Sequence, residues 1–168
     1  MKQTKIAVFA GVLGTTKAFD LTLEEVAQRL RTSYKSEIEH IRTLPKAEYD
    51  EAKKKLHAIL FGGVAVNRTD NDIQEASGLM ITDYDHLPDE DYAEIWEMLK
   101  NDQHTVMLFR SPSGDGIKAV VRIPKSSKDG YRKRFTAYAE YINNPFFDIK
   151  NSNISRLCFV SYDPDLLS

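Results

Sequence analysis

The chain has 168 residues, of which 42% are hydrophobic and 29% charged, and its formal net charge is −2 at pH 7. This length and composition predict one globular domain, residues 1–168, with a core of its own. The net charge argues against a protein whose whole surface coats nucleic acid, although Lys53–Lys55 and residues 125–134 form local basic clusters. Because no apolar run approaches the roughly 20 residues of a membrane helix, and no signal-peptide core is present, we expect a cytoplasmic protein.

The first half of the chain is predicted to alternate between strands and short helices. The segment Thr22-Leu23-Glu24-Glu25 has the spacing of a capping box, so a helix should begin there. Pro45 interrupts the following helical pattern. In chain order we expect a strand over 5–12, a helix after Thr22, a helix over 36–43, a helix from Ala47 through the lysine cluster, a strand over 58–61, and a polar loop over 67–75.

The second half is predicted to contain a hairpin between two helices. We expect a strand that ends in Asp83 and Asp85, a helix from Pro88 to about Lys100, strands over 105–109 and 117–123, a helix over 131–143 and a last strand over 156–162. The elements do not follow a strict β-α-β alternation. This order favours an α+β fold in which helices pack on a mixed β-sheet.

The segment Gly78–Asp85 is an apolar run that ends in two carboxylates, Asp83 and Asp85. In a strand these two side chains point to the same face. Neighbouring carboxylates repel each other, and a hard divalent cation is a common way to offset that repulsion. Without a metal, neutralising the pair is therefore expected to preserve or raise stability. The alternative is that the strand simply ends and the chain enters an acidic loop.

The segment Ser111–Lys118 is a glycine-containing turn followed by a strand. Its exposed N–H groups and serine hydroxyls are suited to an anion cradle, and Lys118 would add a charge for a phosphate. This role requires the strand face shared by Lys118, Val120 and Arg122 to line a cleft. The alternative is an ordinary hairpin turn with Lys118 exposed to solvent. The segment is not a P-loop, because it lacks the Gly-Lys-Ser/Thr sequence and a strand follows it.

The remaining candidate residues carry weaker signals. Asp148 would ordinarily cap a turn, and Cys158 lies in an apolar run that predicts a reduced core residue. The four histidines show no paired spacing, so the sequence gives no support to a zinc site.

Taken in order, these segments resemble the archaeo-eukaryotic primase superfamily of primase-polymerases. The closer similarity is to the primase-like N-terminal domain that precedes virulence-associated protein E-type helicase modules in bacterial mobile elements. The resemblance spans most of the chain. It rests on Ser77-Gly78 before Asp83 and Asp85, on Ser111–Lys118, on Asp148, on Ser155-Arg156, on Tyr162-Asp163-Pro164-Asp165, and upstream on Ile41-Arg42, Lys54–Leu56 and Phe61-Gly62-Gly63.

The resemblance implies a primase-polymerase-like α+β fold with an RRM-like portion and an active site in the cleft between two parts. It implies a DNA primase or polymerase that joins nucleotides on a single-stranded template in the replication of mobile elements. Asp83, Asp85 and Asp148 would be catalytic and would hold two Mg²⁺ or Mn²⁺ ions. Nucleotide binding is implied for Ser111, Ser113, Gly114, Gly116, Lys118 and Arg156.

The resemblance also implies partners, namely nucleoside triphosphates, single-stranded DNA and a helicase module in the same or an associated chain. Lys53–Lys55 or Arg132–Arg134 would contact template phosphates. Because the chain stops soon after its last strand, we expect it to be the N-terminal part of a longer protein.

One departure from the family pattern leaves the activity open. Lys118 occupies a position where active primase-polymerases carry histidine, and an ammonium does not reproduce the hydrogen-bond geometry of an imidazole. A catalytically inactive module that binds nucleotide or single-stranded DNA for an attached helicase is therefore an alternative. A domain used only for protein assembly, with a solvated acidic cluster, is a third.

Overall fold

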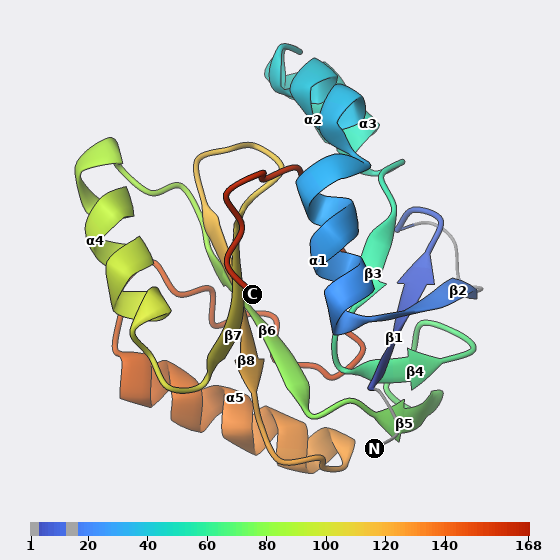
Figure 1. The fold of residues 1–168 in the computed structure, drawn as a ribbon. Coiled ribbons are helices and arrows are strands. Elements are labelled where there is room, and N and C mark those ends of the chain that lie inside the picture. The colour runs from blue at the N-terminus through green and yellow to red at the C-terminus, as the bar shows by residue number, and fades with distance from the viewer. Residues whose placement is uncertain (1–3, 13–16) are drawn as a thin grey trace.

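The computed structural model describes residues 4–12 and 17–168, which form two larger antiparallel sheets and one two-stranded sheet, with helices packed around them (Figure 1). The helices are α1 (Leu23–Thr32), α2 (Lys35–Arg42), α3 (Lys46–Lys53), α4 (Asp89–Lys100) and α5 (Lys128–Ile142). The longer strands are β1 (Lys5–Phe9), β2 (Lys17–Thr22), β6 (Leu79–Tyr84), β7 (Thr105–Arg110) and β8 (Ile117–Arg122). The shorter strands are β3 (Ala58–Leu60), β4 (Gly63–Ala65), β5 (Ile73–Ala76) and β9 (Cys158–Phe159).

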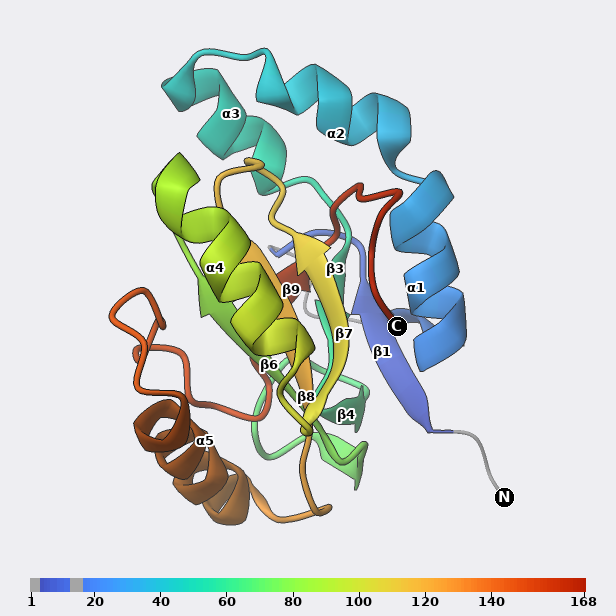
Figure 2. The same ribbon diagram turned by 60° about the vertical axis from the view of Figure 1, so that its left-hand side comes forward.

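One sheet has the strand order β2-β1-β3-β9 and the other has the order β6-β8-β7, while β4 and β5 form a separate pair. The views in Figures 1 and 2 place α1 beside the four-stranded sheet, and α4 and α5 beside the three-stranded sheet. Helices α2 and α3 lie together at one end of the molecule, away from α5. The fold is α+β, as the sequence predicts.

The three-stranded sheet is buried on both faces, and its strands alternate between two cores. Leu79 and Ile81 of β6 join the core that contains α1 and the four-stranded sheet. Met80 and Tyr84 of the same strand join the core beneath α4 and α5. By the same alternation Asp83 lies on the face that is directed toward the four-stranded sheet. A charged side chain is thereby placed between two sheets.

Several local predictions are confirmed. Thr22 is the N-cap of α1, and Thr22 and Glu25 form both hydrogen bonds of a capping box. The β7–β8 hairpin is formed, and α4 begins directly after Pro88. Cys158 is a free thiol in the core, where burial raises its pKa to about 12. No helix in the described ranges is long and apolar enough to cross a membrane.

The sequence prediction is wrong for four of the strands. Part of the expected loop over 67–75 belongs to β5, whose half-exposed sequence Ile-Gln-Glu-Ala has no apolar alternation to reveal a strand. Strands β2 and β4 were likewise not expected, because pairing with β1 and β5 creates them rather than their own pattern. The last strand is only two residues long, because the chain on either side leaves the sheet. The further expectation that Gly14 helps to end the first strand concerns a residue outside the described ranges.

Candidate functional site

The central feature of the site is an ion pair between Asp83 and Lys118, which are directly opposite each other on β6 and β8. Lys118 Nζ donates a hydrogen bond to Asp83 Oδ1, and both side chains are less than a tenth exposed. The face that Lys118 shares with Val120 is directed toward the four-stranded sheet, so it lines the interior rather than solvent.

Arg156 contacts the second oxygen of the same carboxylate. Its Nη2 lies 3.2 Å from Asp83 Oδ2, and its side chain is about 29% exposed. The Nε of Arg156 is buried and has no hydrogen-bond partner among the described residues. Arg156 therefore keeps one buried donor that the described residues leave unpaired, while its side chain as a whole is partly exposed.

Neighbouring charges keep Asp83 and Lys118 in their charged forms. Burial alone would raise the pKa of Asp83, but the neighbouring Lys118 ammonium and then the Arg156 guanidinium lower that pKa below its usual value. Burial likewise works against the charge on Lys118, but the Asp83 carboxylate raises the pKa of Lys118 above its usual value. Each partner of the Asp83–Lys118 pair thus favours the charged form of the other.

The ion pair lies at the wall of a cavity of about 630 Å³, which we call the Asp83 cavity. The polar uncharged lining includes Asn151, Asn153 and Ser155, and the apolar lining includes Leu157 and Phe159. Its charged lining consists of four cations and two carboxylates, an excess of two positive charges. These are Lys53, Arg68, Lys118 and Arg156, and Asp83 and Asp85.

Asp85 follows the end of β6 and, unlike Asp83, is exposed. Both carboxylates line the same cavity, as expected for side chains at i and i+2. The expected repulsion between them is not the main interaction of Asp83, since two cations contact its oxygens. For Asp83, neutralisation should therefore lower stability rather than raise it.

Asp148 is close to Asp83 through its backbone but not through its carboxylate. The Asp148 N–H donates to the carbonyl of Asp83 at 2.9 Å. The Asp148 carboxylate instead accepts from the N–H of Lys150 at 2.9 Å and from the Asn151 amide at 2.6 Å. Asp148 thus caps its own turn, which is the ordinary role of an aspartate at such a position.

This arrangement does not fit a two-metal site held by three carboxylates. Cations occupy both oxygens of Asp83, and the oxygens of Asp148 cap a turn. In the part of the chain that the structure describes, no group of three or more His, Cys, Asp or Glu side chains could hold a metal ion. Hard divalent cations need an excess of oxygen ligands, whereas this cavity has an excess of positive charge.

The Ser111–Gly116 turn is closed by its own hydrogen bonds. The Ser111 hydroxyl accepts from the Gly116 N–H at 3.0 Å, and the N–H of Ser111 donates to the Gly116 carbonyl at 2.8 Å. Gly114 has a φ of +91°, and its N–H donates to the carbonyl of Ser111. A Cβ on Gly116 would lie 2.7 Å from the carbonyl oxygen of Tyr84. The glycines are therefore required by the turn itself.

The outer side of this turn faces a second cavity, of about 430 Å³, that adjoins the Asp83 cavity. Ser113 and Asp115 line it together with Lys46, and Lys53 and Asp85 line both cavities. The structure thus brings Asp83, Asp85, Lys118 and Arg156 together in the Asp83 cavity and places Ser113 in the adjoining cavity. The nucleotide-binding roles of Ser111, Ser113, Gly114 and Gly116 stay a prediction.

With this geometry established, comparison with known proteins places the chain. A family model described as "BT4734-like, N-terminal domain" matches residues 51–167. The chain belongs to this family. The matched range of the BT4734-like domain includes the Asp83, Ser111–Lys118 and Asp148–Asp165 segments on which the resemblance rests.

Among solved structures, the BT4734-like domain is similar to the AEP domain of the primase-polymerase (PrimPol) of cyanophage S-2L, with a TM-score of 0.47 and 17% sequence identity. The similarity covers 70% of this chain and 60% of that one. A similarity of this size says nothing about activity. No curated protein matches the chain.

Some lining residues of the BT4734-like domain carry no signal in the sequence. Arg68 lies in the polar loop between β4 and β5, and Asn151 and Asn153 lie in an irregular segment before Arg156. No helical or strand periodicity marks such positions. Lys53 is different, because it belongs to the basic cluster that is predicted from the sequence to contact phosphates.

Proposed function

We propose that this BT4734-like domain binds a nucleoside triphosphate in the Asp83 cavity, as a nucleotide-binding module of primase-polymerase type. The observation that carries the proposal is the excess of positive charge on the wall of a cavity of about 630 Å³. Small-molecule sites in proteins commonly have volumes of about 300–1,000 Å³ and few convergent polar groups.

The cations of the cavity differ in their freedom to contact a phosphate. Lys118 is committed to Asp83, so it contributes mainly long-range charge. Arg156 contacts Asp83 with one nitrogen and keeps a buried Nε without a partner in the described structure. Arg68 lines the cavity, is exposed, and donates one hydrogen bond to the carbonyl of Val12. Arginine suits phosphate recognition because its planar fork can form two parallel hydrogen bonds, so Arg68 and Arg156 are the proposed phosphate contacts.

The apolar part of the wall supports a base or sugar beside the phosphates. Phe159 lines the cavity and has the Lys53 ammonium 5.2 Å from its ring centroid. Burial lowers the pKa of Lys53, and the nearby charge of Lys118 lowers it further. An anionic ligand would relieve the repulsion between these two cations.

Binding should not require a divalent ion. A metal normally supplies the positive charge that a triphosphate needs, whereas here protein cations already supply it. The test is a calorimetric titration of the protein with a non-hydrolysable nucleoside triphosphate in EDTA and in Mg²⁺. We expect saturable binding in EDTA, which Arg68→Gln and Arg156→Gln each weaken by about tenfold, or 1.4 kcal/mol.

The matched control is Arg122→Gln, because Arg122 is exposed at the opposite end of β8 and does not line the Asp83 cavity. This variant should bind nucleotide like the wild type. If the three variants bind equally, or if binding is lost in EDTA, the proposal is wrong.

Nucleotidyl transfer on a single-stranded template is the second candidate function. Asp83 and Asp85 line one cavity, and the order of motifs resembles primase-polymerases. The test is product formation with labelled nucleotides, a single-stranded DNA template and Mg²⁺ or Mn²⁺. Synthesis that depends on Asp85 would establish an enzyme, whereas nucleotide binding without synthesis would establish the binding module. An attached helicase and a role in mobile-element replication belong to this candidate, on the resemblance alone.

A further inference from the structure

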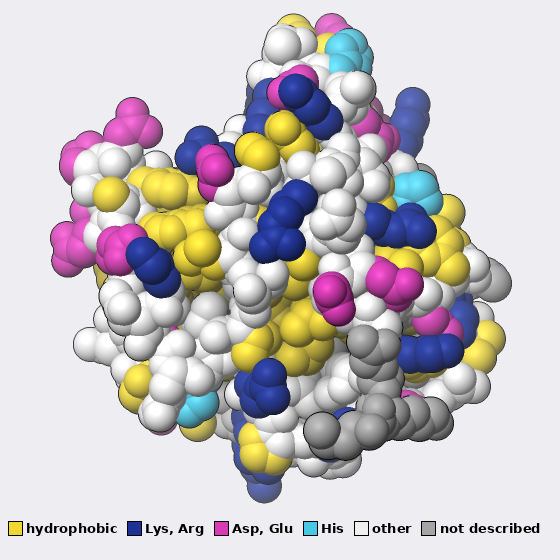
Figure 3. All heavy atoms as spheres, viewed as in Figure 1, with side chains coloured by type: hydrophobic (Ala, Val, Ile, Leu, Met, Phe, Trp, Pro, Cys, Tyr) yellow, Lys and Arg dark blue, Asp and Glu magenta, His cyan; other side chains and the backbone are white. Residues whose placement is uncertain are grey.

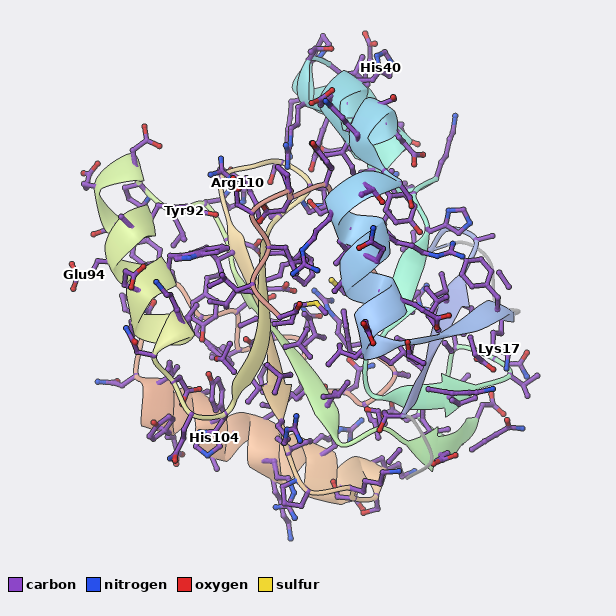
Figure 4. The ribbon with its side chains drawn as sticks, in the orientation of Figure 1. Lys17, His40, Tyr92, Glu94, His104 and Arg110 are labelled. Carbon is purple, nitrogen blue, oxygen red and sulfur yellow. The ribbon has the colours of Figure 1, made fainter. Side chains whose placement is uncertain are left out.

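A further cavity lies between α4, the end of β7 and residues 163–165. Its volume is about 330 Å³, and we call it the Trp96 cavity. Tyr92 and Trp96 of α4 line it together with Arg110 of β7. Figure 4 shows Tyr92 and Arg110 close to each other, whereas Glu94 of the same helix points away from the molecule. The Tyr-Asp-Pro-Asp segment, which the Asp83 cavity does not use, provides the remaining wall through Asp163 and Asp165.

Two aromatic side chains of the Trp96 cavity form a stacked pair. The rings of Tyr92 and Trp96 are stacked, with centroids 6.1 Å apart and an interplanar angle of 16°. The Arg110 guanidinium lies 5.1 Å from the centroid of Tyr92. Trp96 provides the strongest ring for a cation–π contact and is only partly buried. Arg110 thus shows, within the chain, that a guanidinium can pack against this stacked pair of rings.

The charge of the Trp96 cavity has the opposite sign to that of the Asp83 cavity. Three carboxylates and one guanidinium line it, an excess of two negative charges, from Glu97, Asp163, Asp165 and Arg110. Helix α4 extends this field, since it carries five acidic residues and one lysine. Figure 3 shows acidic side chains along α4 beside a hydrophobic patch. Such a surface repels phosphates and attracts cations.

We propose that the Trp96 cavity is a docking site for an arginine-bearing basic peptide segment of a partner protein. The guanidinium would lie against Trp96, and the carboxylates of Glu97 and Asp165 would contact it or a neighbouring basic residue. Arginine fits better than lysine because its planar group stacks on an aromatic face while its edge remains available to a carboxylate. Glu97 is accessible for this role, because its pair with Lys100 is exposed and weak.

The experiment uses the whole chain and a short fluorescein-labelled peptide of alternating glycine and arginine. Trp96 is the only tryptophan, so its intrinsic fluorescence reports on this cavity alone. We expect saturable quenching of Trp96, weaker binding of the matching glycine–lysine peptide, and lower affinity at high salt. Peptide anisotropy should show about tenfold weaker binding for Glu97→Gln combined with Asp165→Asn.

Two matched variants separate this site from general charge attraction. Glu140→Gln combined with Asp129→Asn removes the same charge from exposed positions on α5 and should bind the peptide like the wild type. Trp96→Leu should also weaken binding, and a thermal melt checks that this partly buried position tolerates the change. Equal affinities for the two double variants would overturn the proposal.

Other occupants are distinguished by the same variants. Stronger quenching of Trp96 fluorescence by a single-stranded oligothymidylate than by the glycine–arginine peptide would assign the cavity to a nucleobase and overturn the proposal. Self-association that sedimentation detects, and that Glu97→Gln with Asp165→Asn abolishes, would assign the cavity to a second copy of the chain and also overturn it.

Discussion

Asp83 and Asp163 are buried to the same extent, 6% exposed each, yet the protein stabilises their charges in different ways. Two cations contact the oxygens of Asp83. Asp163 accepts from the backbone N–H groups of Arg110 at 2.8 Å and Asp165 at 3.1 Å, and forms no ion pair with the described residues. Side-chain cations offset the charge of Asp83, whereas backbone N–H groups stabilise the charge of Asp163.

This difference sets the sign of the two cavities. Around Asp83 the cations exceed the carboxylates, so the cavity can attract an anion. Around Asp163 the carboxylate charge is stabilised without being cancelled, so the Trp96 cavity stays negative. A formal net charge of −2 for the whole chain conceals both fields. The distribution of charge, rather than its sum, determines which ligands such a domain attracts.

Lys118→Met should have the largest effect on stability. It leaves Asp83 buried with only the half-exposed Arg156 as a cation, and we expect a loss of about 3–5 kcal/mol in the free energy of unfolding at pH 7. Denaturant titrations measure this. Because the pKa of Asp83 is lowered in the folded wild type, the stabilisation is present above the unfolded pKa near 3.9 and is lost as pH falls through the folded pKa.

The loss caused by Lys118→Met should therefore shrink in acid, where Asp83 is protonated in the unfolded state. Adding Asp83→Asn should recover part of the stability, because no charge then remains buried without its partner. A constant loss from neutral to acidic pH would show that packing of the lysine stem, not the ion pair, is what the substitution removes.

Asp163→Ala should lower the free energy of unfolding by less, about 1–3 kcal/mol, because it removes the acceptor of two backbone hydrogen bonds without breaking an ion pair of the described residues. Denaturant titration at pH 7 measures the loss. The same substitution should leave nucleotide binding unchanged, since Asp163 does not line the Asp83 cavity. Equal losses in the free energy of unfolding for Asp163→Ala and Lys118→Met would mean that the two carboxylates are stabilised in the same way.

Arg156→Gln should separate stability from binding. Its ion pair with Asp83 is partly exposed to solvent, so the free energy of unfolding should fall by at most about 1 kcal/mol. Nucleotide affinity should fall about tenfold if Arg156 contacts phosphate. Calorimetry and a thermal melt on the same preparation test both halves, and unchanged affinity would assign Arg156 a purely structural role.

Asp85→Asn should have the smallest effect on stability, within about 0.5 kcal/mol, because Asp85 is exposed. Nucleotide affinity should be equal or higher, since a negative charge leaves a cavity that binds an anion. Template-directed synthesis, if the domain performs it, should be abolished. A large loss of nucleotide affinity would instead show that Asp85 holds a cation on which the nucleotide depends.

The sequence predicts well what depends on local pattern. The capping box of Thr22 and Glu25, the β7–β8 hairpin and the shared cavity of Asp83 and Asp85 follow from periodicity and turn chemistry. It does not predict that Lys118 would pair with Asp83, because that contact depends on which residues of β6 and β8 lie opposite each other. This register is a tertiary property.

Other parts of the site are beyond local rules for the same reason. Arg68 and Asn153 reach the Asp83 cavity from irregular segments, where no periodicity indicates the direction of a side chain. The three carboxylates of the resemblance follow the expected order along the chain, yet the Asp148 side chain caps its own turn. Order in sequence therefore preserves the position of a residue more reliably than its contacts.

The pairing of Asp83 with Lys118 across β6 and β8 also bears on how the chain avoids misfolding. If β6 slipped by one residue, Asp83 would lie opposite Ile117 or Ala119. The lysine and the aspartate would then face opposite sides of the sheet, each buried without its partner. A strand rich in Leu, Met and Ile could tolerate such a slip on hydrophobic grounds alone. The charge pair makes it costly, so the same contact that shapes the cavity also specifies the alignment of the sheet.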